Sequence, residues 1–169
     1  MACVIREAVL ADVGALVGIL IATKTGSLPH LVESHDLDVA FWTDRWRQYL
    51  AEGSRAQLAL GDGFVLLAEA AGGPVGFAAF HHTRRHDADA ELQALYVLPS
   101  CQRQGIGTAL LLEVARRLAG DGSRSMCVGY HPANPFKGFY ATLGAHEINP
   151  HWAVWRDLGA LAERGSSTG

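Results

Sequence analysis

The chain has 169 residues, with 14 Lys and Arg against 17 Asp and Glu, which gives a formal net charge of −3. One compact domain is expected, because domains commonly contain about 100–200 residues. Hydrophobic residues make up 49% of the chain and charged residues only 18%, which excludes a disordered chain, and the lack of a basic excess argues against general nucleic-acid binding.

The first half of the chain predicts a strand, two helices and a β-hairpin. Residues 3–9 alternate as a strand, and a helix opens at residues 11–12, where Asp12 is the expected N-terminal cap. A second helix ends near Gly53, because apolar residues recur at helical spacing from 39 to 50. The runs 64–70 and 75–82 form a hairpin, with Gly72 and Gly73 supplying positive φ angles to its turn.

The second half alternates more regularly between strands and helices. We expect strands at 90–98, 125–130 and 151–155, a helix at 105–118 that Gly120 closes, and a short helix at 135–143. Adjacent strands without intervening helices favour a mixed sheet over a wholly parallel one. The small polar residues from Arg164 onward predict a loose tail.

The sequence argues against a membrane span, a disulfide framework and a metal site. The apolar run from Val13 to Thr23 has eleven residues and no basic leader, whereas a bilayer span needs about 20 residues, so a soluble, intracellular protein is expected. The three cysteines lack CxxC spacing, which argues against a disulfide framework or a zinc site. His82 and His86 do not share a helix face, so no metal is expected there.

The segment from Glu91 to Gly107 carries the strongest chemical signal. A strand runs into Pro99, and Gly105 and Gly107 then open a helix. The first N–H groups of a helix have no intrahelical acceptor and stabilise an anion, and Arg103 can add a charged contact. The segment is neither a P-loop nor a complete dinucleotide fingerprint, which would need a third glycine.

Two motifs resemble those of the GCN5-related N-acetyltransferases, the GNAT family. Gln102-Arg103-Gln104-Gly105-Ile106-Gly107 resembles its [QR]-x-x-G-x-[GA] acetyl-coenzyme A motif, and Asn134-Pro135-Phe136-Lys137-Gly138-Phe139-Tyr140-Ala141-Thr142-Leu143-Gly144 resembles its N-P-x-x-x-F-Y-x-x-L-G segment. The resemblance covers most of the chain, although residues 25–60 carry no comparable signature.

The resemblance implies an α/β, GNAT-like single domain over residues 1–160, followed by a loose tail over 161–169. Its mixed, mostly antiparallel sheet is flanked by helices, and its central parallel strands splay apart to admit acetyl-coenzyme A. The implied coenzyme contacts are Leu95, Tyr96, Val97, Gln102, Arg103, Gln104, Gly105, Ile106, Gly107, Thr108, Asn134 and Phe139. A cytoplasmic location is expected, with no membrane or nucleic-acid partner; a homodimer is an open expectation, since dimers are common among similar proteins.

The implied chemistry needs a base and an acid. Glu91 lies eleven residues before Gln102 and matches the catalytic glutamate of some members, which acts through water. Tyr140 matches the acid that protonates the departing thiolate, and a backbone N–H near Leu95 would polarise the acetyl carbonyl. Rival bases occur just upstream of the strand, at Asp87, Asp89, His81, His82 and His86.

The expected function is therefore transfer of an acetyl group from acetyl-coenzyme A directly to a primary amine of a small molecule or peptide. The alternative is an acyl-coenzyme A binding or regulatory module without catalysis. The stripe of Trp42, Trp46 and Tyr49 is a buried helix face or an acceptor-site wall. Acidic residues at Glu33, Asp36 and Asp38 either favour a cationic amine or form a solvated loop, so the acceptor stays open among polyamines, amino acids, antibiotics and peptide amines.

Overall fold

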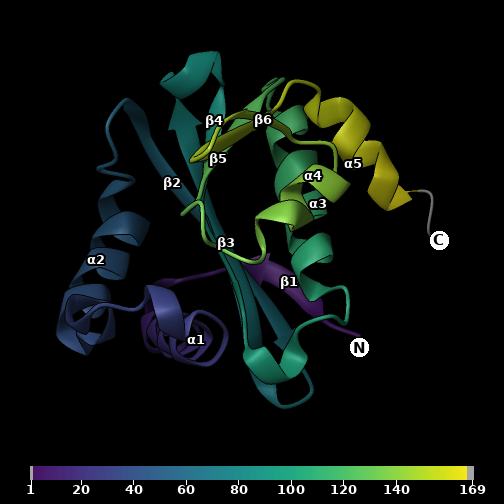
Figure 1. Cartoon of the computed structure of the whole chain (residues 1–169). Helices are drawn as coiled ribbons and strands as arrows, with labels where there is room; N and C mark the ends of the chain where they lie inside the picture. Colours follow the sequence, from purple (N-terminus) through teal and green to yellow (C-terminus); the bar gives the residue numbers. More distant parts are fainter. Residues whose placement is uncertain (1, 167–169) are drawn as a thin grey trace.

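The structure, a computed structural model, describes residues 2–166 and contains one seven-stranded mixed sheet (Figure 1). The strand order is β1-β2-β3-β4-β5-β7-β6. Only β4 and β5 pair in parallel, and every other neighbouring pair is antiparallel. The predicted mixed sheet is thereby confirmed. Its strands are β1 (Val4–Glu7), β2 (Ala59–Ala70), β3 (Gly73–Thr83), β4 (Ala90–Val97), β5 (Met126–Gly129), β6 (His146–Asn149) and β7 (Trp152–Trp155).

Helices cover both faces of this sheet. α1 (Val13–Ser27) and α2 (Val39–Glu52) lie on one face, and α3 (Ile106–Gly120) and α5 (Leu158–Ser166) lie on the other (Figure 1). The short α4 (Lys137–Thr142) follows β5 and lies beside α3 in this view. The described residues also form the 3-10 turns η1 (Leu10–Asp12), η2 (Pro29–Leu31), η3 (Ser34–Leu37), η4 (Arg85–Asp87) and η5 (Pro99–Cys101).

The apolar run near the N-terminus forms most of helix α1. With η1 it forms the helical segment Leu10–Ser27, which is longer than the predicted run and has a mean hydropathy of 1.3, so it passes the length and composition test for a bilayer span. Its residues Leu16, Val17 and Leu20 are buried in the core against the sheet and α2. This burial accounts for the apolar residues that face the sheet, and 33% of the segment is buried in all. Asp12 makes no side-chain cap to α1.

The β2–β3 hairpin and the end of α3 each use one glycine of positive φ. In the β2–β3 hairpin that residue is Gly73, with φ +111°, whereas Gly72 does not adopt a positive φ, contrary to the prediction for both. After α3 it is Gly122, with φ +96°, because the helix extends through Gly120 instead of closing there.

Two elements were not predicted from the sequence. The strand β6 completes the sheet edge, and all four of its residues are exposed. The helix α5 places Leu158 and Leu161 in the core beneath α3. The segment 161–169 was expected to be a loose tail, but it is helical through Ser166, and residues 167–169 lie outside the described part of the chain.

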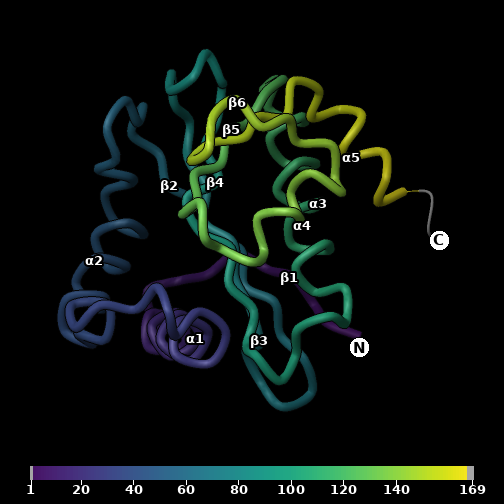
Figure 2. The backbone as a smooth tube through the Cα atoms, viewed as in Figure 1, coloured from purple at the N-terminus to yellow at the C-terminus, as the bar shows by residue number. Residues whose placement is uncertain are grey.

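The centre of the sheet forks between its two parallel strands. Residues Ala90–Leu92 of β4 pair with Met126–Val128 of β5, and β4 then continues to Val97 with no strand on that side. Figure 2 shows the chain after β5 running away from β4 toward α4. An extra residue, Gln93, interrupts the β3–β4 register just beyond the fork, between the pairs Phe80–Leu92 and Ala79–Ala94.

Candidate functional site

The fork opens into a cleft of about 880 Å³. Its walls come from β4, the start of α3, the end of α1 with the loop after it, and the β5–α4 segment. The imidazole Nε2 of His30, in the loop after α1, donates to the carbonyl oxygen of Ala133, 3.3 Å away in the β5–α4 loop. The cleft is therefore bounded by segments that are distant in sequence, and it brings together both motifs identified in the sequence.

One wall is the N-terminus of α3, which no side chain caps. Ala109 N–H makes the first helical bond, to the Gly105 carbonyl, so the N–H groups of residues 106–108 have no helical acceptor. Gly105 has φ +84°, and a Cβ there would meet no protein atom within 4 Å. Arg103 also has positive φ, at +62°. The result is an open backbone cradle that suits a diphosphate.

Gly107 is less constrained than Gly105. A Cβ at Gly107 would lie 3.7 Å from Phe139 and 3.8 Å from Val97, both ordinary contacts. Of the two motif glycines, only Gly105 is therefore required by its own backbone conformation.

The polar side chains of the loop before α3 hold the loop itself in place. The Gln102 amide donates to the carbonyl oxygen of Val97 and to the hydroxyl of Ser27, both at 2.9 Å. Thr23 on α1 also donates to the Val97 carbonyl, at 3.0 Å. Gln104 donates to the Ser100 carbonyl. The side chains of Gln102 and Gln104 therefore hold the loop, and the coenzyme contacts expected for these two residues stay predictions.

The open edge of β4 presents the backbone of Leu95. Leu98 N–H donates to the Val75 carbonyl on β3, and backbone groups alternate between the two edges of a strand, so Leu95 and Val97 face the fork. The Val97 carbonyl is already occupied by Thr23 and Gln102. Within residues 2–166 no strand pairs with this edge at Leu95, so its N–H and carbonyl are open to a ligand that lies along β4.

Tyr140 on α4 lines the same cleft. Its ring stacks on Tyr130 with centroids 5.9 Å apart and meets the Trp155 ring edge-on at 5.9 Å. The hydroxyl has no hydrogen-bond partner within residues 2–166. Burial raises the pKa of this phenol well above its ordinary value, and the nearby Tyr96 and Tyr130 raise it further. Tyr140 is therefore a protonated donor with a free hydroxyl.

Other expected contacts also line the cleft. Asn134 lies there, although its Oδ1 accepts the Phe136 N–H and so shapes the turn before α4. Phe139 packs edge-on against Tyr140, with ring centroids 5.5 Å apart. Burial raises the pKa of Tyr96, on β4, to about 12, with a contribution from the Asp36 carboxylate. Of the expected coenzyme contacts, Gln104 and Ile106 do not line the cleft, and Ile106 is buried in the core.

Glu91 lies outside this lining. Its side chain is buried, with Oε2 3.2 Å from Arg85 Nε and 3.4 Å from Nε2 of His81, which is 0% exposed. The extra residue Gln93 reverses the alternation of β4, so Glu91 shares a face with the buried Tyr49 rather than with Leu95.

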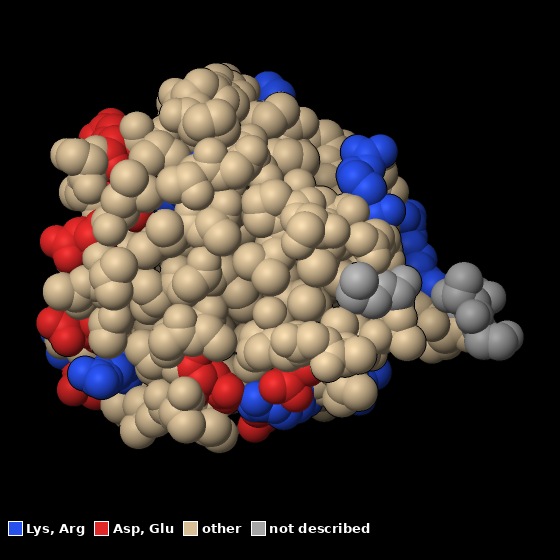
Figure 3. Space-filling model, turned by 90° about the horizontal axis from the view of Figure 1, so that it is seen from below, with Lys and Arg blue, Asp and Glu red and all other residues tan. Residues whose placement is uncertain are grey.

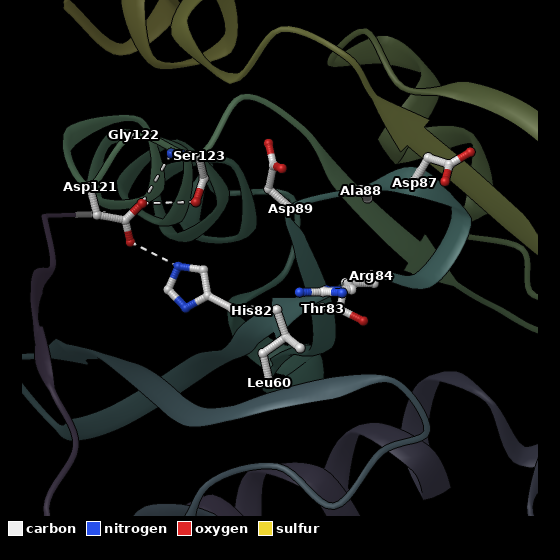
Figure 4. Close-up of a pocket in the computed structure, with 10 residues that line it drawn as sticks. All are labelled: Leu60, His82, Thr83, Arg84, Asp87, Ala88, Asp89, Asp121, Gly122 and Ser123. Atoms are coloured by element: carbon white, nitrogen blue, oxygen red, sulfur yellow. Dashed lines mark hydrogen bonds and ion pairs between the residues drawn. The ribbon is translucent and has the colours of Figure 1, made fainter.

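The rival bases lie outside the cleft as well. Figure 4 shows three of them around a shallow depression of about 720 Å³ at the far end of β3. There His82 Nε2 lies 3.0 Å from Asp121, whose other oxygen accepts from the backbone and hydroxyl of Ser123. Asp89 accepts from the Arg124 and Ser125 N–H groups. No group of three metal-ligating side chains occurs within residues 2–166.

Lys24 lines the cleft from α1, and nothing in the local sequence marks it. Its Nζ donates to Asp36 Oδ1 at 2.6 Å and lies 5.5 Å from the centre of the Trp42 ring. Burial raises the pKa of Asp36, but hydrogen bonds from Lys24 and the Glu33 N–H outweigh that effect and hold it below its usual value. The carboxylate is therefore charged and positions the ammonium group.

Comparisons with known proteins agree with this geometry. The profile of the "Acetyltransferase (GNAT) family" matches residues 31–145. An uncharacterized N-acetyltransferase, YuaI of Bacillus subtilis, is 30% identical over 150 residues, which cover 85% of this chain and 80% of YuaI.

Solved structures with the same fold include coenzyme complexes. The PaiA N-acetyltransferase of Thermoplasma acidophilum in complex with coenzyme A has a TM-score of 0.73 at 19% identity, covering 93% of this chain and 99% of that one. A GNAT family acetyltransferase of Brucella melitensis in complex with acetyl-CoA has a TM-score of 0.64 at 21% identity, covering 92% and 88%.

Proposed function

Because the chain belongs to the GNAT family and is an acetyl-CoA-dependent N-acetyltransferase, we propose that its acceptor is a primary amine of a small molecule or peptide. The observation that carries the proposal is the free phenol of Tyr140 in the same cleft as the uncapped start of α3. The phenol can protonate a departing thiolate, and the N–H groups at the start of α3 can hold the diphosphate of the donor.

We place the donor along the open edge of β4. Its diphosphate would accept hydrogen bonds from the N–H groups of residues 106–108, and its thioester carbonyl would accept one from the Leu95 N–H. A preorganised donor of this kind stabilises a developing oxyanion by about 2.7–4 kcal/mol. This placement leaves the thioester near the fork, where Tyr140 reaches the cleft.

The reaction then proceeds by direct attack. The neutral amine forms a C–N bond to the acetyl carbon and gives a tetrahedral intermediate. When the C–S bond breaks, the hydroxyl of Tyr140 supplies a proton to the sulfur. The amine loses its extra proton to water, and water returns a proton to the Tyr140 phenolate. A general base must lie within hydrogen-bond reach of the amine or one water away. The base role expected for Glu91 stays a prediction, and its ion pair with Arg85, outside the cleft lining, favours a structural role.

The alternative is a binding module without catalysis. A module that only binds acyl-coenzyme A has no need for a free phenol beside the thioester, so Tyr140 favours the enzyme. Incubation with acetyl-CoA and a panel of amines, followed by detection of both released thiol and acetylated product, tests the proposal. Coenzyme binding without product from any amine would support the module instead. The cytoplasmic location and the homodimer stay predictions.

A further inference from the structure

We infer that the acceptor amine carries a carboxylate and no second positive charge, and that Lys24 recognises this carboxylate. The inference rests on the proposed transfer to an amine and narrows its substrate class. Three features support it: the charges that line the cleft, the face from which the acceptor enters, and the way in which Lys24 is held.

The first feature is the charge of the lining. Within residues 2–166, no Asp or Glu lines the cleft, whereas Lys24, Arg103 and His131 do. Arg103 belongs to the cradle before α3, and Nδ1 of His131 accepts the Ala133 N–H. Lys24, which is paired with Asp36 behind the lining, is therefore the ammonium group that remains for a second substrate. A polyamine would find no carboxylate in the lining for its second ammonium group and would have to compete with Lys24 for Asp36.

The second feature is the position of Lys24 relative to the donor. The diphosphate cradle belongs to α3, on one face of the sheet, and Lys24 belongs to α1, on the other (Figure 1). With the donor along the open edge of β4 and its diphosphate at the start of α3, the α1 side of the cleft is left for the acceptor. Lys24, Tyr96 and Tyr140 all line the same cleft, so the ammonium group of Lys24 opens into the space that the phenol of Tyr140 reaches.

The third feature is that the Lys24 ammonium group is fixed in position but keeps hydrogen-bond donors for a ligand. Its side chain is 19% exposed and donates one hydrogen bond, to Asp36, so two of its three N–H donors are free for a ligand. Asp36 does not itself bind the acceptor, because its other oxygen accepts the Glu33 N–H and the residue does not line the cleft. The indole N–H of Trp42 donates to the Asp36 carbonyl and fixes the turn.

The acidic residues expected to attract a cation are engaged elsewhere. Asp38 accepts the Phe41 N–H at the start of α2, and the exposed Glu33 lies 3.4 Å from His35. In the view from below, red Asp and Glu atoms lie along the left edge and along the bottom, with blue Lys and Arg atoms among them (Figure 3). Leu28, Leu31 and Tyr96 supply the walls near Lys24. They suit a short apolar body between the amine and the carboxylate.

The test uses three series of acceptors with matched carbon chains: ω-amino carboxylates, alkylamines and α,ω-diamines of two to six carbons. Product formation with acetyl-CoA gives kcat/KM for each acceptor on wild type, on Lys24→Met, on the charge-retaining Lys24→Arg and on Arg47→Met. The last variant removes an exposed positive charge from α2, outside the cleft lining. Coenzyme A affinity is measured separately by calorimetry.

We expect wild type to favour the best amino carboxylate over its matched alkylamine by at least about tenfold, and to use diamines least. Lys24→Met should bring the first ratio to one or below, because the Asp36 carboxylate then has no cationic partner, and should leave coenzyme A affinity unchanged. Lys24→Arg and Arg47→Met should keep the preference. A wild-type preference for diamines, or no preference, would overturn the inference and leave amine acetylation intact. A ratio unchanged in Lys24→Met would overturn the role of Lys24. Absence of product from every amine would instead refute the proposed function.

Discussion

Replacement of Gly105 by alanine separates coenzyme binding from folding. Gly105 has φ +84° at the start of α3, where an added Cβ meets no protein atom within 4 Å. Gly122, just beyond the other end of the same helix, has φ +96° and equally open surroundings. Gly122→Ala therefore imposes a similar backbone strain far from the cleft and serves as the matched control.

The structure gives two separate magnitudes. The left-handed conformation costs an L-residue about 1–2 kcal/mol, and for chains of 150–250 residues each kcal/mol lowers Tm by about 2–4 °C, so both variants should lose a few degrees. Only Gly105→Ala also places a methyl group in the cradle. Loss of one charge-assisted hydrogen bond to the diphosphate costs about 1.5–3 kcal/mol, which weakens coenzyme A binding about tenfold to a hundredfold.

Calorimetric titration of both variants with coenzyme A, alongside thermal unfolding, tests this reasoning. S-acetylpantetheine, which lacks the diphosphate, should bind Gly105→Ala and wild type equally. If folded Gly105→Ala bound coenzyme A within threefold of wild type, the cradle would not be the diphosphate site. If Gly122→Ala lost the same affinity, backbone strain and not the added methyl group would be the cause.

Three further variants test other parts of the account. Tyr140→Phe should lower kcat about 10²–10⁴-fold while coenzyme A affinity stays constant, and a loss of affinity instead would show a packing role. Glu91→Gln should lower Tm, because it weakens the contact with Arg85, and should leave the pH profile of kcat unchanged. If the variant lost the acidic limb of that profile, Glu91 would be the general base after all. Hydrogen bonds from Arg6 hold the pKa of Asp12 below its usual range, so this carboxylate contributes stability above about pH 4 that is lost as pH falls through its folded pKa. In Asp12→Asn this contribution to the free energy of unfolding should be absent, as unfolding measured over a range of pH would show. A loss of stability in acid equal to that of wild type would contradict the role given to Asp12.

The sequence predicted the elements that carry local signals. The start of α3 follows from Gly105 and Gly107 after a strand, and the position of α4 follows from the segment between Asn134 and Gly144. Strand β6 could not be found this way, because all its residues are exposed and show no alternation of burial. In α5 only Leu158 and Leu161 are buried, and the surrounding small residues resemble a tail.

The side chains of the site were harder to place, because one extra residue in β4 decides which face each occupies. Counting back by twos from Val97 and Leu95 puts Glu91 on their face of the strand, and the irregularity at Gln93 reverses this. Lys24 was missed because the local sequence does not show which residue it contacts. Its role depends on Asp36, which follows a turn and is brought back to α1 by tertiary structure.

The carbonyl oxygen of Val97 ties the two halves of the site together. Thr23 attaches α1 to this atom, and Gln102 attaches the loop that leads to the diphosphate cradle. Lys24 is the next residue after Thr23, so one backbone oxygen anchors both the loop before α3 and the end of α1. The two segments that carry Arg103 and Lys24 are therefore held in register with β4 through a single atom, and no separate contact is needed to align them.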